Sequence, residues 1–331
     1  MMRIAMLSFA HVHAAGYAKQ VQDHPETSIA CVWDDDETRG RAAAESLGVA
    51  YESDLDAVLS RDDIDGVVVN ATTKQHTEVL LAACRYRKHI FTEKALTITT
   101  ADADRVVAAV HESGIKFMIS LPSRVAPETL YMKELIDSGK LGKITLMRAR
   151  IAHSASLDNW FKGGSAWFGD ADAAGGGALF DLGCHTVDVM RWFLGEPVSV
   201  IAKVQNFSGT YNIDDNSAVV VEFKNGALGI LDTSWVQRAG PSPIEIYGTE
   251  GYVARGTPIY NGIVLNSTNT NVSGYILPTD LPKPLPMPFK QWVDACLRDT
   301  PMTITVEDGR NLTQLLEGTY QSASSGKEYR F

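Results

Sequence analysis

The sequence lacks the cysteine patterns that hold metals or staple small secreted domains. Its four cysteines, Cys31, Cys84, Cys184 and Cys296, lie far apart, and no two of them form a CxxC pair. This spacing excludes a zinc-ribbon framework and a dense disulfide scaffold. It favours reduced thiols, and we therefore expect a cytoplasmic protein.

An excess of positive charge is also missing. Thirty lysines and arginines stand against forty acidic residues, which gives a net charge of −10. We expect no nucleic-acid partner and no anionic membrane partner, because phosphate binding needs clustered lysine and arginine. No apolar run has the length of a membrane span, and the apolar first ten residues lack a cleavage-type ending, so no signal peptide is expected. A chain of 331 residues has room for two domains.

The third absence is a glycine-rich phosphate loop. "MLSFAHVHAAGYA" (residues 6–18) runs from an apolar strand through a turn into a helix, as a dinucleotide-binding unit does. Ser8, Ala10 and His13 occupy the glycine positions of G-x-G-x-x-G. The order of the elements nevertheless predicts a dinucleotide loop, with more contact from side chains than usual.

An acidic residue, Asp34, ends the next predicted strand, about 20 residues further on, where such a residue holds a ribose 2′-hydroxyl. Asp34, Asp35 and Asp36 together would repel a 2′-phosphate, so NAD is favoured over NADP. The alternative is that these acids only cap the next helix.

His11 and His13 raise the question of a metal. In a turn that enters a helix the two imidazoles would not stay aligned, and no third ligand lies nearby in the sequence. We therefore expect no metal. A histidine N–H at a helix start suits an anion instead.

The first third of the chain alternates short apolar strands with amphipathic helices, which predicts a doubly wound parallel sheet, the Rossmann fold. The expected strands are 3–9, 28–33, 66–70, 89–93 and 116–120. Ligands of such a sheet bind beyond the carboxyl ends of its strands. We place this domain at residues 1–121.

Residues 122–331 predict an α+β domain with a large, open, mainly antiparallel sheet. A long strand at 143–154, a helix at 179–195 and strand-like runs at 198–207, 217–236 and 244–254 follow one another, with a hairpin turn at Asn225-Gly226. A proline-rich connector (277–288) leads to a helical segment at about 289–325 that is expected to pack back on the body.

Two groups of residues have the character of a catalytic site. Glu93 and Lys94 end a predicted parallel strand, where a lysine can bind a reacting oxygen, although such a pair is often only a surface ion pair. In "GGGALFDLGCHTVDVMRW" (175–192), Asp181, His185 and Asp188 share one helical face. A carboxylate beside an imidazole suits a general base, and the alternative is a pair that merely caps a helix start.

These motifs together resemble the Gfo/Idh/MocA oxidoreductase family of glucose–fructose oxidoreductase and inositol dehydrogenase. The resemblance covers nearly the whole chain, in order. Its pieces are "VVVNATTKQHTEVLLAACRYRKHIFTEKALTIT", "GGGALFDLGCHTVDVMRW", "NGALGILDTSW", "IEIYGTEGYV" and "LEGTYQSASSGKEYRF".

The resemblance implies a nicotinamide cofactor between the two domains and hydride transfer at a sugar or polyol carbon. It also implies a homodimer or homotetramer formed through the open sheet. Lys94 matches the lysine of the family's Glu-Lys-Pro motif, and Asp181 and His185 match its Asp-x-x-x-His pair. His185, oriented by Asp181, would take a hydroxyl proton while Lys94 stabilises the alkoxide. The candidate cofactor residues are Ser8, Phe9, Ala10, His11, Val12, Asp34, Asp35, Ala71, Thr72, Thr73, His76, Glu93 and Lys94.

One departure from the family concerns Ala95, which stands where relatives have proline. A cis bond costs about 3–4 kcal/mol before alanine and little before proline, so the placement of Lys94 is a question for the structure.

On the substrate side, the aromatic residues of the loop at 158–177 predict either a sugar-stacking wall or a plug between domains. The candidate substrate residues are Lys94, Arg124, His153, Trp160, Trp167, Asp181 and His185. Two further functions stay open: glycoside cleavage through transient oxidation by NAD, and a non-catalytic sugar or NAD sensor.

Overall fold

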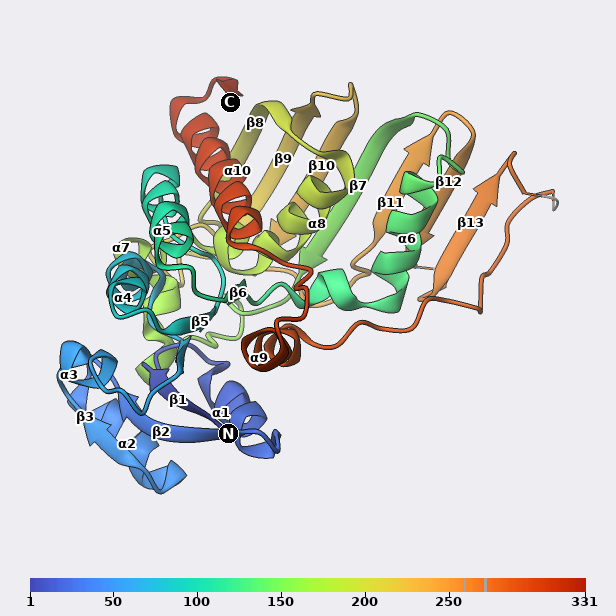
Figure 1. The fold of residues 1–331 in the computed structure, drawn as a ribbon. Coiled ribbons are helices and arrows are strands. Elements are labelled where there is room, and N and C mark those ends of the chain that lie inside the picture. Colours follow the sequence, from blue (N-terminus) through green and yellow to red (C-terminus); the bar gives the residue numbers. More distant parts are fainter. Residues whose placement is uncertain (259, 271–272) are drawn as a thin grey trace.

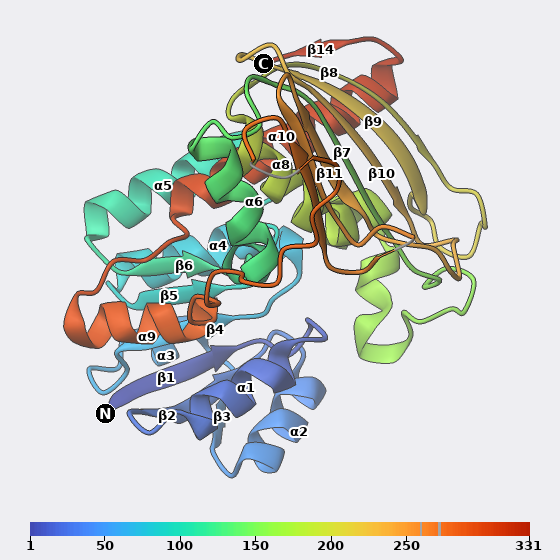
Figure 2. The same ribbon diagram turned by 90° about the vertical axis from the view of Figure 1, so that its right-hand side faces the viewer.

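The computed structural model describes residues 1–258, 260–270 and 273–331 of the chain. Two β-sheets organise it, one formed by the first third of the sequence and one by the rest (Figure 1). Helices fill the space between the two sheets, and the second sheet leaves its other face uncovered (Figure 2).

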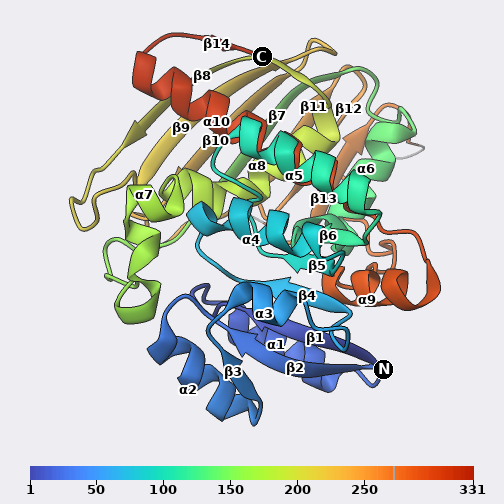
Figure 3. The same cartoon turned by 60° about the vertical axis from the view of Figure 1, so that its left-hand side comes forward.

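The N-terminal sheet is six-stranded and parallel, with the order β3-β2-β1-β4-β5-β6. This is the Rossmann order, so the predicted doubly wound sheet is confirmed. Its strands are β1 (Met2–Leu7), β2 (Thr27–Trp33), β3 (Ala50–Glu52), β4 (Gly66–Val69), β5 (His89–Thr92) and β6 (Phe117–Ile119). Its helices are α1 (Ala14–Asp23), α2 (Glu37–Leu47), α3 (Leu55–Leu59), α4 (Thr73–Arg85) and α5 (Thr100–Ser113) (Figure 3).

The central strands are buried on both faces, which is why they read as continuous apolar runs. All four residues of β4 are buried, as are four consecutive residues of β1, Ile4–Leu7. Sequence reasoning missed β3 and α3, because three and five residues are too few to show a periodicity.

The second sheet has eight strands in the order β13-β12-β11-β7-β10-β9-β8-β14. Only β7 and β10 pair in parallel, so the predicted open, mainly antiparallel sheet is confirmed. Asn225 and Gly226 form the predicted turn between β9 and β10, and Gly226 has a φ of 84°. The strands are β7 (Ile144–Ala152), β8 (Pro197–Gln205), β9 (Asn216–Phe223), β10 (Leu228–Ser234), β11 (Ile244–Gly248), β12 (Gly251–Arg255), β13 (Ile263–Ser267) and β14 (Tyr329–Arg330).

The segment between β6 and β8 carries most of the helices that lie on the inner face of this sheet. These elements are η1 (Pro122–Val125), α6 (Pro127–Asp137), η2 (Gly163–Gly169), α7 (Ala171–Ala174), η3 (Leu179–Gly183) and α8 (Cys184–Leu194). Helix α8 packs against β7 and β10, and α6 packs against β12.

The C-terminal segment forms two helices rather than the single helical stretch expected at 289–325. Helix α9 (Pro288–Arg298) packs against β5 and β6 of the first sheet, whereas α10 (Val306–Ser325) lies between α5 and β8. The chain end therefore contacts both sheets, and the division at residues 121 and 122 stays a prediction. None of the helices described is long and apolar enough to span a membrane.

Candidate active site

The turn after β1 replaces glycine with serine and keeps the conformation that glycine usually supplies. Ser8 has a φ of 69°, in the left-handed region, and its side chain is fully buried. Its hydroxyl accepts a hydrogen bond from Ala10 N at 3.2 Å. A polar side chain that bonds its own turn stabilises a conformation that costs energy for a residue other than glycine. The loop thus turns as a dinucleotide loop does, while Val12 at its tip is exposed.

Asp34 lies at the end of β2 as expected, but its carboxylate is already engaged. Its Oδ2 accepts from Phe9 N at 2.7 Å and from Arg39 Nε at 3.0 Å, and its Oδ1 accepts from Asp36 N at 3.0 Å. The side chain is fully buried, whereas that of Asp35 is 40 % exposed. The capping role belongs to Asp36, which accepts from Arg39 N at the start of α2. Asp34 therefore ties the loop to β2, and Asp35 is the acid that faces outward.

A buried carboxylate, Glu93, holds the start of α1. His13 Nδ1 lies 2.9 Å from Glu93 Oε1, the Tyr17 hydroxyl donates to the same oxygen, and His11 Nε2 lies 3.6 Å from Oε2. Burial would raise the pKa of Glu93, but the imidazoles of His11 and His13 outweigh it and hold that pKa below its usual range. Burial lowers the pKa of His11 to about 4, and the hydrogen bond to Glu93 raises the pKa of His13.

The expectation that the two histidines would not lie together is wrong. Their ring centroids are 4.7 Å apart, and with Glu93 they form a group of possible metal ligands. The chain folds back at Val12, which brings both rings to one carboxylate. However, His13 N donates to His11 Nδ1 at 3.2 Å, so neutral His11 carries its proton on Nε2. His11 then directs an N–H toward Glu93, which suits a hydrogen-bond acceptor better than a cation.

Lys94 crosses from the first sheet to the second half of the chain. Its Nζ donates to Asp181 Oδ1 and to the Asp181 carbonyl oxygen, both at 2.6 Å. Burial would lower the pKa of Lys94, but the Asp181 carboxylate outweighs it and raises that pKa; Lys94 in turn holds the pKa of Asp181 below its usual range. The Lys94–Ala95 peptide is cis. With alanine in place of proline, the lysine reaches Asp181, a partner that the sequence did not predict for it.

His185 lies on the same helical segment as Asp181. The expected hydrogen bond between the two side chains is not formed. Residues 179–183 form a π-helical turn, so the regular i, i+4 alignment that predicted the pair does not hold there. Asp181 instead takes the lysine, because a buried ammonium is the stronger donor. Among the described residues, His185 Nδ1 has no hydrogen-bond partner although it is buried. Burial, together with the charge of Lys94, lowers the pKa of His185 to about 4, so its imidazole is neutral at pH 7.

The last of the three glycines before this turn, Gly177, is needed because a buried acid lies against it. Asp214 Oδ1 accepts from Gly177 N at 2.8 Å and from the Tyr320 hydroxyl at 2.9 Å. A Cβ on Gly177 would lie 1.9 Å from the Asp214 carbonyl oxygen. Asp214 and Tyr320 thus fix the start of the π-helical turn. Sequence reasoning missed both, since no local motif marks a partner more than thirty residues away.

The other predicted cofactor residues line the end of β4. Ala71 and Thr73 are buried, and Thr72 forms a capping box with Gln75 at the start of α4. His76 Nδ1 donates to the carbonyl oxygens of Ala95 at 2.9 Å and Leu96 at 3.2 Å. His76 therefore positions the segment that follows Lys94.

A dinucleotide suits the edge where β1 and β4 end. Both polar atoms of the Asn70 side chain are buried there without a hydrogen-bond partner among the described residues, as is His76 Nε2, and His11 Nε2 has only its 3.6 Å contact with Glu93. Buried polar groups without partners are rare in folded proteins. Asn70 was not among the predicted residues, yet its place directly after a buried strand was a usable signal.

The aromatic loop closes over the dinucleotide loop. Trp167 Nε1 donates to the Ala10 carbonyl oxygen at 2.9 Å, and the ring of Phe168 lies 5.2 Å from that of His11. A small cavity of about 10 Å³ brings Trp167 and Phe168 together with Thr73, Lys94 and Asp181. Trp160 is 52 % exposed and stacks on His153, with 4.7 Å between ring centroids. His153 and Trp160 thus form an accessible stacked pair, whereas Trp167 and Phe168 plug the space between the two halves.

Arg124 lies outside this arrangement. Its guanidinium is buried and binds both oxygens of Asp188, at 2.9 and 2.6 Å, and Asp308 at 2.8 Å. These bonds occupy its nitrogens, so we do not retain Arg124 as a substrate residue. The same bonds explain why Asp188 does not form a hydrogen bond with His185.

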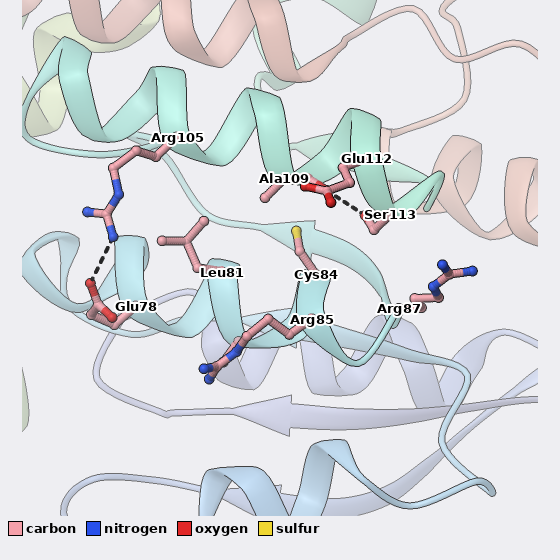
Figure 4. Close-up of a pocket in the computed structure, with 10 residues that line it drawn as sticks. Glu78, Leu81, Cys84, Arg85, Arg87, Arg105, Ala109, Glu112 and Ser113 are labelled. Carbon is pink, nitrogen blue, oxygen red and sulfur yellow. Dashed lines mark hydrogen bonds and ion pairs between the residues drawn. The ribbon is translucent and has the colours of Figure 1, made fainter.

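A larger cleft of about 480 Å³ lies between α4 and α5 (Figure 4). Arg105 points across it to Glu78 on the facing helix, at 3.7 Å. None of the predicted cofactor or substrate residues lines this cleft, and we assign it no function.

Comparison with known proteins agrees with this geometry. A myo-inositol 2-dehydrogenase of Thermotoga maritima is 26 % identical over 260 residues, which cover 76 % of this chain and 74 % of that protein. An NAD⁺-dependent scyllo-inositol 2-dehydrogenase of Bacillus subtilis is 26 % identical over 262 residues, which cover 77 % and 74 %. The crystal structure of GenD2 from gentamicin A biosynthesis, in complex with NAD, has a TM-score of 0.82 and 27 % identity, and the match covers 100 % of this chain and 96 % of that one.

Two family models match in succession. Residues 3–121 match the NAD-binding Rossmann fold of this oxidoreductase family, and residues 129–254 match the GFO/IDH/MocA C-terminal domain. Together they span most of the sequence, and the chain belongs to the Gfo/Idh/MocA oxidoreductase family.

Proposed function

We propose that this protein is an NAD-dependent dehydrogenase that moves a hydride between the nicotinamide and a secondary alcohol of a sugar or cyclitol. The observation that carries the proposal is the contact of Lys94 with Asp181 across the two halves of the chain, beside a buried neutral His185. The inositol dehydrogenases to which the chain is similar support the substrate class.

His185 is the proposed general base. An imidazole with its pKa lowered to about 4 is unprotonated at neutral pH and can accept the hydroxyl proton. Bound NAD would accept the hydride. Desolvation keeps water from competing for the imidazole.

Lys94 is the proposed stabiliser of the developing alkoxide. An ammonium has three N–H donors, and Asp181 takes two of them, which leaves one for the substrate oxygen. Asp181 keeps this lysine charged and fixes its direction. The buried charge then acts in a low dielectric, where electrostatic stabilisation of an oxyanion is strong.

For the cofactor, we propose that Asp35 rather than Asp34 binds the adenosine ribose. Asp35 is the more exposed of the two acids, and Gln75 Nε2 donates to its Oδ2 at 2.6 Å across the ends of β2 and β4. A second negative charge from a 2′-phosphate would lie against this carboxylate, which favours NAD.

On the substrate side, the stacked pair of Trp160 and His153 is the proposed sugar platform. Trp167 is the residue expected to shift when the dinucleotide enters, since its indole bonds the loop at Ala10. Burial lowers the pKa of His153, which leaves a neutral ring for stacking.

We also propose a homodimer or homotetramer formed through the open sheet. Ile201 on β8, Val220 on β9 and Leu228 on β10 are 56 %, 43 % and 44 % exposed on its uncovered face. Apolar side chains that cluster on a sheet face favour a partner surface.

We further propose a cytoplasmic location. The four cysteines are unpaired, which supports this location.

The test is a turnover screen of inositols and sugars with NAD and NADP. His185→Ala and Lys94→Met are expected to lower kcat by about 10²–10⁴-fold while NAD still binds. His111→Ala, an exposed histidine paired with Glu307, is the matched control and should keep full activity. Turnover within a few-fold of the wild type in both site variants would refute the roles, and glycoside cleavage without net NADH would refute the dehydrogenase.

A further inference from the structure

Arg255 occupies a position that its neighbours fill with apolar side chains. It ends β12 and pairs directly with Ile244 of β11 and Ile263 of β13, and Ile244 in turn pairs with Ala149 of β7. Directly paired residues point to the same face of a sheet. Ala149, Ile244 and Ile263 are all buried, so this row lies on the inner face, where α6 covers β12.

The guanidinium of Arg255 has no partner in the part of the chain that the structure describes. No described residue forms a hydrogen bond or an ion pair with it, and its Nε is buried. Burial lowers the pKa of Arg255, opposed only by the field of the Glu128 carboxylate at the start of α6. A partly buried charge without a partner is costly, and natural proteins rarely keep one that nothing binds.

The side chain borders an open cleft of about 730 Å³, within the size range of small-molecule sites. Two turns form its walls, one before β11 at residues 240–242 and one after β12 at 256–258. Ser242 supplies a hydroxyl group, Asn261 an amide group and Glu128 a carboxylate to the lining. The Thr257 hydroxyl is engaged within its own turn, where it bonds the backbone of Tyr260.

We propose that this cleft, the Arg255 cleft, is a binding site for a hydroxylated organic anion. The carboxylate or phosphate of the ligand binds the guanidinium, whose planar fork matches both groups. The ligand's hydroxyl groups donate to Glu128 and bond with Ser242 and Asn261. Glu128 disfavours an inorganic anion as the occupant, because its carboxylate repels the anionic charge and an inorganic anion brings fewer hydroxyl donors than a sugar to offset that repulsion.

The Arg255 cleft is separate from the proposed sugar platform of His153 and Trp160. Strand β12 lies two strands from β7, roughly 10 Å away, and His153 lies four residues beyond Ala149, roughly 13 Å along β7. One monosaccharide ring cannot span the resulting distance. The anion therefore belongs to the far end of an extended substrate or to a second ligand, and the site does not depend on the roles of Lys94 and His185.

The experiment measures binding to the full chain by titration calorimetry. The probes are D-glucuronate and D-glucose 6-phosphate, with D-glucose and inorganic phosphate as comparisons. At least one anionic sugar is expected to bind more tightly than both comparison probes. Arg255→Gln should weaken that binding at least tenfold and Glu128→Gln several-fold, with unchanged NAD binding as the measure of folding.

The matched control is Arg148→Gln, since Arg148 is an exposed arginine on β7 of the same sheet. This variant should bind the anionic sugar as the wild type does. Oxidation of the bound sugar with NAD would identify the far end of a substrate, and a changed KM for another alcohol would identify a second ligand. The proposal is overturned if neither anionic sugar binds, if inorganic phosphate binds as well as they do, or if Arg255→Gln changes only the oligomeric state.

Discussion

Asp181→Asn is the sharpest test of the contact between the two halves of the chain. The substitution keeps the shape of the side chain and the carbonyl oxygen that Lys94 also binds, and it removes only the charge. Lys94 has 5 % of its side chain exposed, so its ammonium cannot turn to solvent in compensation. Asparagine thus leaves a buried cation without its anion.

The expected loss of stability follows from this burial. Removing one partner of a buried ion pair costs about 3–5 kcal/mol, whereas exposed pairs contribute about 0–1 kcal/mol. Asp181 keeps 18 % of its side chain exposed, which places the expected loss at the lower end, about 3 kcal/mol. That loss corresponds to a fall in Tm of roughly 4 °C for a chain of this size.

The assay is urea unfolding of four proteins: the wild type, Asp181→Asn, Lys94→Met and the double variant. The double variant should be no less stable than Asp181→Asn, with a coupling free energy of about 2 kcal/mol. Asp172→Asn is the control, because Lys74 and Asp172 form an equivalent pair between α4 and α7 that is exposed. If Asp181→Asn cost no more than Asp172→Asn, the Lys94–Asp181 contact would not be the buried pair described here.

Three further results are expected. For His185 the folded pKa of about 4 lies below the ordinary histidine value of 6.5. The unfolded chain therefore binds more protons between these pH values, and stability falls as pH drops through that window. His185→Gln should flatten this slope in urea midpoints, and an unchanged slope would contradict a depressed pKa. The acid limb of kcat/KM for alcohol oxidation should lie near pH 4, and a limb near 6.5 would remove His185 as the buried base. Gly177→Ala should destabilise the protein by about 3 kcal/mol because its Cβ meets backbone at 1.9 Å, while Gly164→Ala, with open space around it, should be neutral in the same thermal unfolding assay.

The order of elements was predictable because each element carries its own signal. The β1 and β4 strands are buried on both faces and read as continuous apolar runs, and the Asn225-Gly226 turn marks its hairpin. Strand β13 (Ile263–Ser267) was not predicted because it is short and mixes apolar and polar residues, although the Asn261-Gly262 pair directly before it is a turn signal. The break between α9 and α10 was not predicted, because both helices are amphipathic and the hydrophobic periodicity alone does not separate them.

The sequence predicted which residues form the candidate site, but it did not predict which of their side chains bond to one another. Lys94, Asp181 and His185 could be named because their motif spacing survives in this chain. Which of them would bond depended on two facts that no local pattern carries. The π-helical turn changes the direction of Asp181, and the Rossmann half delivers an ammonium to it. The bonding of Asp34 could not be predicted for a related reason. Its carboxylate accepts hydrogen bonds from Arg39 and from Phe9 N, and neither contact follows from a local sequence pattern.

The end of β5 connects the cofactor loop to the substrate helix through two consecutive residues. Glu93 faces the turn after β1, where it holds His13, and Lys94 faces the second half of the chain, where it holds Asp181. Successive side chains leave an extended segment on opposite sides, which is what allows one strand end to serve both. The charges of Glu93 and Lys94 also have opposite effects on His11: the Glu93 carboxylate raises the pKa of His11, and the Lys94 ammonium lowers that pKa. A change in the protonation or position of either residue therefore alters the electrostatics of both halves of the site. Displacing Lys94, the proposed stabiliser of the alkoxide, is expected to disturb the proposed dinucleotide loop as well.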